Sequence, residues 1–268
     1  MKKIISLVLA MALMLTAMVA FTSCGNEDEN ILVCGVTPIP GMNEQDENGN
    51  WIGFESEFAM EVAKLLDMEV KFQVIDWGQK YSELNSGKID CIWNGFTANS
   101  SDDGIERKNL VDFSYTYMLN QQCVVIHKNN AEKIKTVEDL AGKTAAVETG
   151  SAGASYAAEA TGSKDNLVTF AAQNSTFMEV KSGKSDIAVV DILLAKNICG
   201  KGDFEDLMIV ETITLDSEYY AVGFKKGNEL KDKVNEAIKT LNENGKLLEL
   251  AKKYGLENSL KVDYTVEY

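Results

Sequence analysis

Two stretches of the chain echo each other, SELNSGKID at Ser82–Asp90 and MEVKSGKSD at Met178–Asp186. Each is typical of a helix end that stops at a glycine and turns into a buried strand. The strands that follow are Cys91–Trp93 and Ile187–Val190. Two common helix-to-strand turns can resemble each other by chance. We interpret the echo instead as two lobes with a similar order of elements.

Apolar strand-like runs alternate with helix-like runs around the first echo. The strand-like runs are Ile31–Val36, Val70–Ile75 and Ile89–Trp93, and the helix-like runs are Phe54–Leu66 and Tyr81–Asn85. Such alternation predicts the α/β class, with each lobe a mostly parallel sheet flanked by helices.

Two further strand-like runs, Gln122–Lys128 and Tyr219–Lys226, are predicted to connect the lobes. The first lobe would then comprise residues 31–121 plus 222–268. The second lobe would comprise residues 122–221, with a hinge strand at both of its ends.

The N-terminus has the order of a secretory signal. Lys2 and Lys3 precede the uncharged run Ile4–Phe21, and small residues lead to Cys24. The run is also about long enough to span a bilayer as a plain signal anchor. The segment resembles a bacterial lipoprotein signal, which implies a signal peptide of residues 1–23, a lipid on Cys24 and a tether linker of residues 24–30. Both interpretations place the remaining chain outside the cytoplasm, and we favour the lipid anchor.

The charge and the cysteines restrict the function classes. The chain has 26 basic and 41 acidic residues, and removal of Lys2 and Lys3 leaves 24 − 41 = −17. Such an acidic chain repels phosphate backbones, so we expect no nucleic-acid partner. Four cysteines beyond Cys24 lack CxxC spacing and His127 is the one histidine, so we expect neither a metal site nor a cofactor. The cysteines could pair in an exported chain, but buried free thiols are the simpler interpretation.

Three features could bind the charged ends of an amino acid. Open α/β sheets bind ligands beyond the carboxyl ends of their strands, where Asp191 lies, although Asp191 could also be a plain helix N-cap. The turn Gly150–Gly153 could cradle a carboxylate with its amides, or could be an ordinary flexible turn. Arg107 could pair with a carboxylate, or could be a solvated surface charge.

A series of motifs then carries a family resemblance across nearly the whole chain after Cys24. The motifs are Gly53–Ala59, Asp76–Trp77, Ser86–Asp90, Trp93–Thr97, Glu106–Lys108, Val111–Ser114, Asp139–Lys143, Gly150–Ser151, Ser182–Asp186 and Asp191. In this order they resemble the family 3 solute-binding proteins of amino-acid ABC transporters. The resemblance implies a two-lobed, periplasmic-binding-protein-like fold (type II) that closes on a free amino acid. It also implies a monomer that works with ABC permease subunits and is not an enzyme.

The resemblance also implies roles for individual residues. Gly95, Thr97 and Arg107 would bind the ligand carboxylate from the first lobe, and Asn94 belongs to the same turn. Ser151 and the amide of Ala152 would meet that carboxylate from the second lobe.

Asp191 would hold the ligand ammonium, and Trp77 would pack on the ligand side chain. Glu148 would face the pocket, which favours a polar or cationic ligand, unless it turns outward or pairs with a lysine. Tyr219, near the returning hinge, is a further candidate.

Three departures from the family pattern are visible. The loop before Arg107 is longer than usual, with Asn99–Gly104 inserted, and Glu55 replaces the usual aspartate. The segment Thr37–Asn43 lacks the aromatic residue that often stacks over the ligand, and Ile39 or Met42 stands in its place.

Two other function classes share the fold. One is an enzyme similar to cyclohexadienyl dehydratases, and the other is a ligand-sensing ectodomain for a membrane receptor. The sequence has no G-x-S-x-G nucleophile elbow at Ser151, because Gly150 directly precedes the serine. Val137 likewise breaks a phosphate loop that would end at Thr144.

Overall fold

The structure is a computed structural model that describes residues 30–265. The predicted signal peptide, Cys24 and most of the tether linker lie outside the described residues. From Leu32 onward the chain forms one compact unit. Within residues 30–265, every helix is too short or too polar to cross a bilayer.

One five-stranded sheet has the order β4-β1-β5-β15-β8. Its strands are β1 (Ile31–Val36), β4 (Glu69–Val74), β5 (Cys91–Ile92), β8 (Asp112–Phe113) and β15 (Gly223–Phe224). β1 and β5 are parallel, whereas β15 pairs antiparallel with both β5 and β8. The sheet therefore combines a parallel pair with a strand that returns from the far end of the chain.

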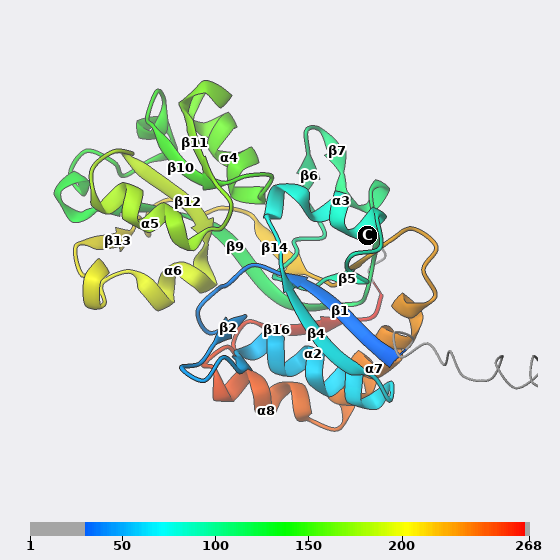
Figure 1. Ribbon diagram of the computed structural model, residues 1–268. Helices are drawn as coiled ribbons and strands as arrows, with labels where there is room; N and C mark the ends of the chain where they lie inside the picture. Colours follow the sequence, from blue (N-terminus) through cyan, green and yellow to red (C-terminus); the bar gives the residue numbers. More distant parts are fainter. Residues whose placement is uncertain (1–29, 266–268) are drawn as a thin grey trace, which may run out of the picture. The chain divides into compact units, whose positions relative to one another are not determined.

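Three helices pack together beside this sheet: α2 (Phe54–Leu65), α7 (Leu230–Glu243) and α8 (Lys246–Lys253). α2 forms because its apolar residues recur at helical spacing. Phe58 of α2 packs edge-on against Trp93, with ring centroids 5.1 Å apart, and against Tyr117 at 5.2 Å. Figure 1 shows α2, α7 and α8 side by side, so segments from both ends of the described chain build this part of the molecule.

The second sheet has the order β11-β10-β12-β9-β13, and β14 and β16 also pair with β9. Its strands are β9 (Thr116–His127), β10 (Ala145–Glu148), β11 (Leu167–Phe170), β12 (Ile187–Asp191), β13 (Leu207–Ile209), β14 (Ser217–Tyr220) and β16 (Leu260–Asp263). β10 is parallel to β11 and β12, but β9 is antiparallel to all of its partners. The helices α4 (Ala152–Thr161), α5 (Asn174–Lys181) and α6 (Ile192–Ile198) contact this sheet.

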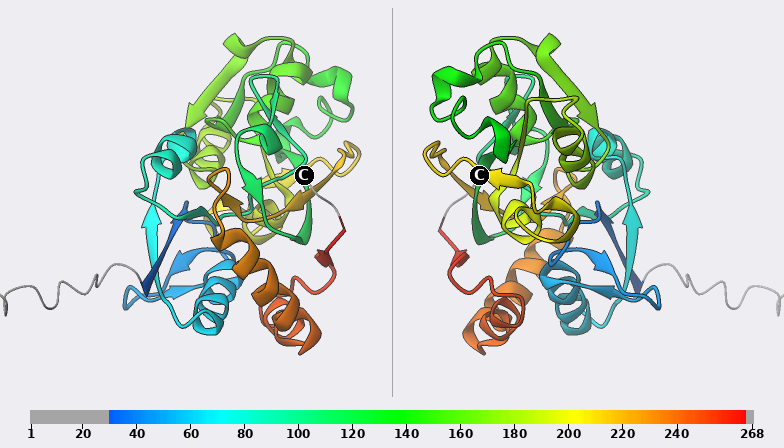
Figure 2. Two further views of the ribbon diagram at one scale, coloured as in Figure 1. Left: turned by 90° about the vertical axis from the view of Figure 1, so that its right-hand side faces the viewer. Right: turned by 90° about the vertical axis from the view of Figure 1, so that its left-hand side faces the viewer.

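The sheets are therefore mixed, whereas the sequence predicted mostly parallel ones. The parallel pairs come from the β-α-β segments, as expected. The antiparallel pairs come from β9, β14, β15 and β16, the strands that cross between or return to the two sheets. Figures 1 and 2 show the long β9 running beside β14 between the two groups of helices.

The two echoed stretches adopt the same local structure. The first begins within α3 (Lys80–Asn85) and leads into β5, and the second begins within α5 and leads into β12. Gly87 and Gly183 both take a positive φ, 74° and 72°, which glycine adopts readily.

The last residue of each echoed stretch is an aspartate, and its hydrogen bonds connect the turn to the neighbouring segment. Asp90 accepts a hydrogen bond from the Val33 amide at 2.8 Å, and Asp186 accepts one from the Thr144 amide at 2.9 Å. In both cases the aspartate's own amide donates back to the same residue's carbonyl. These reciprocal bonds explain why the two sequences share their closing Asp.

Two short hairpins complete the described chain: β2 (Glu44–Gln45) with β3 (Trp51–Ile52), and β6 (Ser101–Asp102) with β7 (Ile105–Glu106). The second hairpin overlaps the inserted segment Asn99–Gly104.

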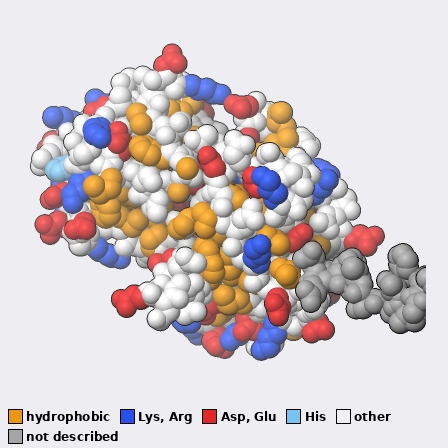
Figure 3. Space-filling model, viewed as in Figure 1, with side chains coloured by type: hydrophobic (Ala, Val, Ile, Leu, Met, Phe, Trp, Pro, Cys, Tyr) orange, Lys and Arg blue, Asp and Glu red, His pale blue; other side chains and the backbone are white. Residues whose placement is uncertain are grey.

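The four cysteines of the described residues are free thiols: Cys34, Cys91, Cys123 and Cys199. On the face shown in Figure 3, basic side chains are scattered among acidic ones and form no continuous patch.

Candidate functional site

The carboxyl ends of β5, β10 and β12 carry the residues of one pocket. Nine of the ten predicted ligand-binding residues line it: Trp77, Asn94, Gly95, Thr97, Arg107, Glu148, Ser151, Ala152 and Asp191. Gln122 and Gln173 also line it and were not predicted. The space between these side chains is about 10 Å³, room for roughly one water molecule. An amino acid therefore fits only if the walls move apart.

Tyr219 is the predicted residue that the pocket does not include. Along β14, successive side chains point to opposite faces. The buried residues on this strand are Glu218 and Tyr220, on either side of the half-buried Tyr219. The ring of Tyr220 lies against Gly95, where an added Cβ would be 3.0 Å from it. Tyr220 therefore packs behind the turn at Gly95, and neither tyrosine is among the residues that line the pocket.

Arg107 is not a solvated surface charge, because it is only 1% exposed. Its Nε and Nη2 groups donate to Asp102 Oδ1 at 3.1 and 2.9 Å. Nη1 donates to the carbonyl of Thr97 at 3.1 Å, and Nη2 also reaches the carbonyl of Gly150 at 3.3 Å. These four bonds leave one N–H on Nη1 for the pocket.

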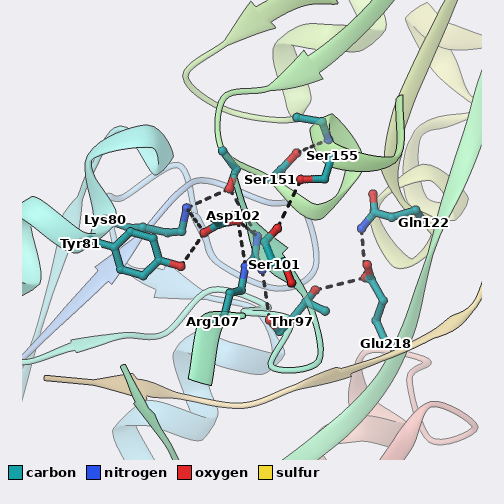
Figure 4. Close-up of polar contacts among 12 residues, drawn as sticks. Lys80, Tyr81, Thr97, Ser101, Asp102, Arg107, Gln122, Ser151, Ser155 and Glu218 are labelled. Atoms are coloured by element: carbon teal, nitrogen blue, oxygen red, sulfur yellow. Dashed lines mark hydrogen bonds and ion pairs between the residues drawn. The ribbon is translucent and has the colours of Figure 1, made fainter. Parts of the chain in front are cut away.

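A cluster of charged side chains surrounds Asp102, as Figure 4 shows. The Asp102 carboxylate also accepts from the Tyr81 hydroxyl at 2.5 Å and lies 3.3 Å from the Lys80 ammonium. Burial pushes the pKa of Asp102 up, but Arg107 and Lys80 outweigh burial and hold that pKa below its usual range. Burial, with Arg107 nearby, lowers the pKa of Lys80 to about 8. Lys80 and Asp102 were both missed by the sequence analysis.

The turn before α4 presents amides toward the pocket. Gly150 has φ 68°, and the Ser151 hydroxyl caps the helix by accepting from the Ala154 amide at 3.0 Å. The N–H of Ala152 therefore lies in the first turn of a ten-residue helix, where the helix dipole favours an anion. Gly153 allows the helix to approach the sheet, since an added Cβ would be 2.7 Å from Gln122 Oε1 and from the Val189 carbonyl.

Asp191 occupies the N-cap position of α6, but its side chain makes no capping hydrogen bond. Instead, it accepts hydrogen bonds from three side-chain amides: Asn120 at 2.7 Å, Gln122 at 2.6 Å and Gln173 at 2.5 Å. Burial raises the pKa of Asp191 despite these donors. The plain N-cap alternative is therefore wrong, and the carboxylate is held at the pocket.

Glu148 ends β10 and is only 1% exposed, so it does not turn outward. Its Oε1 atom has no hydrogen-bond partner. Burial, with Asp191 nearby, raises the pKa of Glu148 to about 8, and Lys80 only partly offsets this. A buried carboxyl oxygen without a donor is costly.

Glu218 is a further carboxylate that the sequence analysis missed. Its Oε2 accepts from Asn120 at 2.7 Å, Gln122 at 3.0 Å and Thr97 at 3.2 Å. Asn120 and Gln122 therefore bridge Glu218 to Asp191. Burial, with Asp191 nearby, raises the pKa of Glu218 to about 7. Alternation along β9 would have placed Asn120 and Gln122 on one face, which was a usable signal.

Two lining residues serve mainly to shape the pocket. The Asn94 side chain turns away to bond Thr37 and Asn43, which ties β1 to the turn after β5. Trp77 packs edge-on against Phe96, with ring centroids 5.4 Å apart. Glu55 is buried and supports the turn after β5 by accepting a hydrogen bond from the Gly95 amide at 3.0 Å.

Within the described residues, no group of three or more His, Cys, Asp or Glu side chains could hold a metal ion.

Comparison with known families identifies the class of protein. The family model of bacterial extracellular solute-binding proteins, family 3, matches residues 31–257. The chain belongs to this family. The family membership confirms the resemblance seen in the motifs.

Relatives and solved structures agree with this solute-binding family. The arginine-binding extracellular protein ArtP of Bacillus subtilis (strain 168) is 28% identical over 247 residues, covering 88% of this chain and 92% of ArtP. An ancestral arginine-binding protein, solved bound to glutamine, matches with a TM-score of 0.77 and 31% identity, covering 85% of this chain and 99% of that one.

A third match bears on the enzyme alternative. The ancestral amino-acid-binding protein AncCDT-1, a precursor of cyclohexadienyl dehydratase, has a TM-score of 0.72 and 30% identity, covering 84% of this chain and 95% of that one. The expected two-lobed α/β fold of family 3 is confirmed by these matches.

Proposed function

We propose that this family 3 protein binds a free amino acid with a polar or cationic side chain and delivers it to the permease subunits of an ABC importer. The observation that carries the proposal is an excess of buried acceptors at the pocket. Glu148 Oε1 and Gln122 Oε1 are buried without a donor, and Asp191 adds a carboxylate that lines the same pocket. A ligand that brings several N–H donors would satisfy them.

The orientation of the ligand follows from the charges. Its carboxylate would accept from the remaining Nη1–H of Arg107 and from the Ala152 amide. Its ammonium would lie at Asp191, and its side chain would reach Glu148 beside Trp77. In this arrangement each charged end of the ligand meets an opposite charge, and Glu148 Oε1 gains the donor that it lacks.

Binding would take place between two lobes that close on the ligand. We assign residues 31–121 plus 222–268 to the first lobe and 122–221 to the second, with β9 and β14 as the hinge strands. Support comes from hydrogen bonds that reach across the pocket, such as Lys80 Nζ to the Gly150 carbonyl at 2.8 Å. Opening would break such bonds and make the room that an amino acid needs.

A thermal-shift screen with the standard amino acids tests the proposal. A ligand at about a hundredfold its Kd adds roughly 2.7 kcal/mol to the free energy of unfolding. We expect arginine, lysine, histidine or glutamine to raise the melting temperature. A screen in which no amino acid raises it would contradict the proposal.

Catalysis is a second candidate, favoured by the likeness to AncCDT-1 and by the raised pKa of Glu148, which leaves a proton on that carboxyl near neutral pH. Incubation with prephenate or arogenate, followed by chromatography of the products, separates the two functions. Turnover that Glu148→Gln abolishes would establish an enzyme. We expect no turnover, because Asp191 and Arg107 suit the two charged ends of an amino acid.

The protein would act at the outer face of the bacterial membrane, tethered through a lipid on Cys24. This proposal rests on the lipoprotein-signal-like sequence from Lys2 to Cys24. Mass spectrometry of native protein should find a diacylglyceryl group on Cys24 and no residues before it. Mature protein that retains Met1–Phe21 would contradict the tether.

A further inference from the structure

The inserted hairpin has contacts with the opposite side of the pocket as well as with its own. Ser101–Glu106, here called the hairpin strap, belongs to the segment before Arg107. The carbonyl of Ser101 accepts from the Ser155 hydroxyl of α4 at 3.4 Å. Asp103 pairs with Lys164, just beyond α4, at 2.8 Å. The strap thus reaches from the predicted first lobe to the first helix of the predicted second lobe.

Asp102 of the strap holds two cations that both bind the second lobe. Arg107 and Lys80 each contact the Asp102 carboxylate, and each donates to the Gly150 carbonyl. Arg107 and Lys80 are buried, being 1% and 2% exposed. Charge-assisted hydrogen bonds of buried groups are stronger than exposed ones. The Gly150 carbonyl is therefore clamped by two cations that Asp102 orients.

Asp102 does not itself line the pocket, whereas Arg107 does. Asp102 therefore lies behind the arginine and leaves the ligand-facing N–H of Nη1 free. This position differs from that proposed for the ligand carboxylate, at the remaining Nη1–H of Arg107 and the Ala152 amide. It fits a positioning residue, which fixes Arg107 while the arginine also meets the second lobe.

We propose that the hairpin strap holds the two lobes closed, with Asp102 as the positioning residue that links the carboxylate site at Arg107 to closure at Gly150. The inference rests on the proposed binding between two lobes and extends it. In a protein without the strap, the ligand and a few other contacts, such as the bond from Asn197 Nδ2 to the Pro40 carbonyl at 3.2 Å, would bridge the lobes. Here the hairpin strap supplies part of the contact between the lobes, so the closed conformation is populated before any amino acid binds.

The test compares Asp102→Asn with Glu106→Gln, a matched control in the same hairpin. Asp102→Asn removes the charge that orients Arg107 and Lys80, with little change of volume. Glu106→Gln removes an exposed ion pair with Lys108 of the same lobe, whose contribution is small. Small-angle scattering without added amino acid should give a larger radius of gyration for Asp102→Asn than for the wild type and Glu106→Gln. Equal radii of gyration for all three proteins would overturn the inference that the strap holds the lobes closed.

Binding kinetics supply a second readout that a merely structural role would not move. With L-arginine as the probe, Asp102→Asn should associate faster, because the cleft opens more often, and dissociate about tenfold faster. Slower association, or unchanged dissociation, would overturn the inference. Lys80→Met, which keeps the apolar stem but loses the bond to Gly150, should act in the same direction if Asp102→Asn fails to fold.

The failure of the proposed function can be told apart from the failure of the strap. Absence of L-arginine binding in every variant would count against a cationic ligand. The scattering comparison needs no ligand, so it still decides whether the strap closes the lobes.

Discussion

The side-chain amide of Gln122 donates a hydrogen bond to Asp191 Oδ1 at 2.6 Å, and the two residues are also direct partners in the pairing of β9 with β12. The carboxylate proposed to hold the ligand ammonium is therefore fixed to β9, one of the two proposed hinge strands. A ligand bound at Asp191 would contact the hinge itself.

Asp191→Asn should weaken amino-acid binding strongly. The substitution removes the charge opposite the ligand ammonium and places an amide donor among the amides of Asn120, Gln122 and Gln173. Loss of one partner of a buried charge pair typically costs about 2–5 kcal/mol of binding. Calorimetric titration measures this loss, and Asp206→Asn, exposed beside β13, serves as the control. Equal affinities of Asp191→Asn and the wild type would remove Asp191 from the site.

The pH dependence of stability and of binding should have opposite signs. Glu148 has its pKa raised to about 8 in the folded protein, so the folded state binds more protons than the unfolded state between about pH 4.5 and 8. Its contribution to stability is full below that window and is lost as the pH rises through it. Without ligand, the melting temperature should fall across this range.

The affinity for a cationic ligand should rise across the same range, because Glu148 gains its charge. Lys80, with its pKa lowered to about 8, begins to lose its proton only at the top of the window. Glu148→Gln should make both profiles less steep, and the raised pKa values of Asp191 and Glu218 should leave part of the slope of stability. A wild-type affinity that stays constant from about pH 6 to 8.5 would show that Glu148 does not face the ligand's cation.

Gly153→Ala tests the close packing of α4 on the sheet. The new methyl group would be 2.7 Å from Gln122 Oε1 and the Val189 carbonyl, so the helix must shift. Overpacking of this kind typically costs about 1–3 kcal/mol of the free energy of unfolding, despite the better helix propensity of alanine. Urea denaturation should show the loss, whereas Glu159→Ala on the exposed face of the same helix should change little.

Much of the fold was predictable because it depends on local patterns. The echoed turns at Gly87 and Gly183 predicted the two β-α-β segments, and the runs around β9 and β14 predicted the crossings. Mixed pairing was not predictable, since the direction of β15 and β16 depends on where distant segments return. Hydrophobic periodicity does not carry that information.

The site was predictable where family motifs cover it, and less so elsewhere. Tyr219 was named from its place near the hinge, but a one-residue step along a strand changes the face. Lys80 and Asp102 were missed because their partners come from separate segments and from an inserted loop. Lys80 can be buried beside Arg107 because the Asp102 carboxylate contacts both cations.

Whether the pocket binds an amino acid with its side chain at Glu148 is tested most directly by calorimetric titration with L-arginine and with L-citrulline. Citrulline has nearly the same shape as arginine but a neutral side chain. Arginine should bind at least about tenfold more tightly than citrulline, and Glu148→Gln should narrow this difference in affinity. Leucine and valine should bind weakly, because they leave Glu148 without a donor. Tight binding of leucine or valine, with no competition from arginine, lysine, histidine or glutamine, would contradict this prediction.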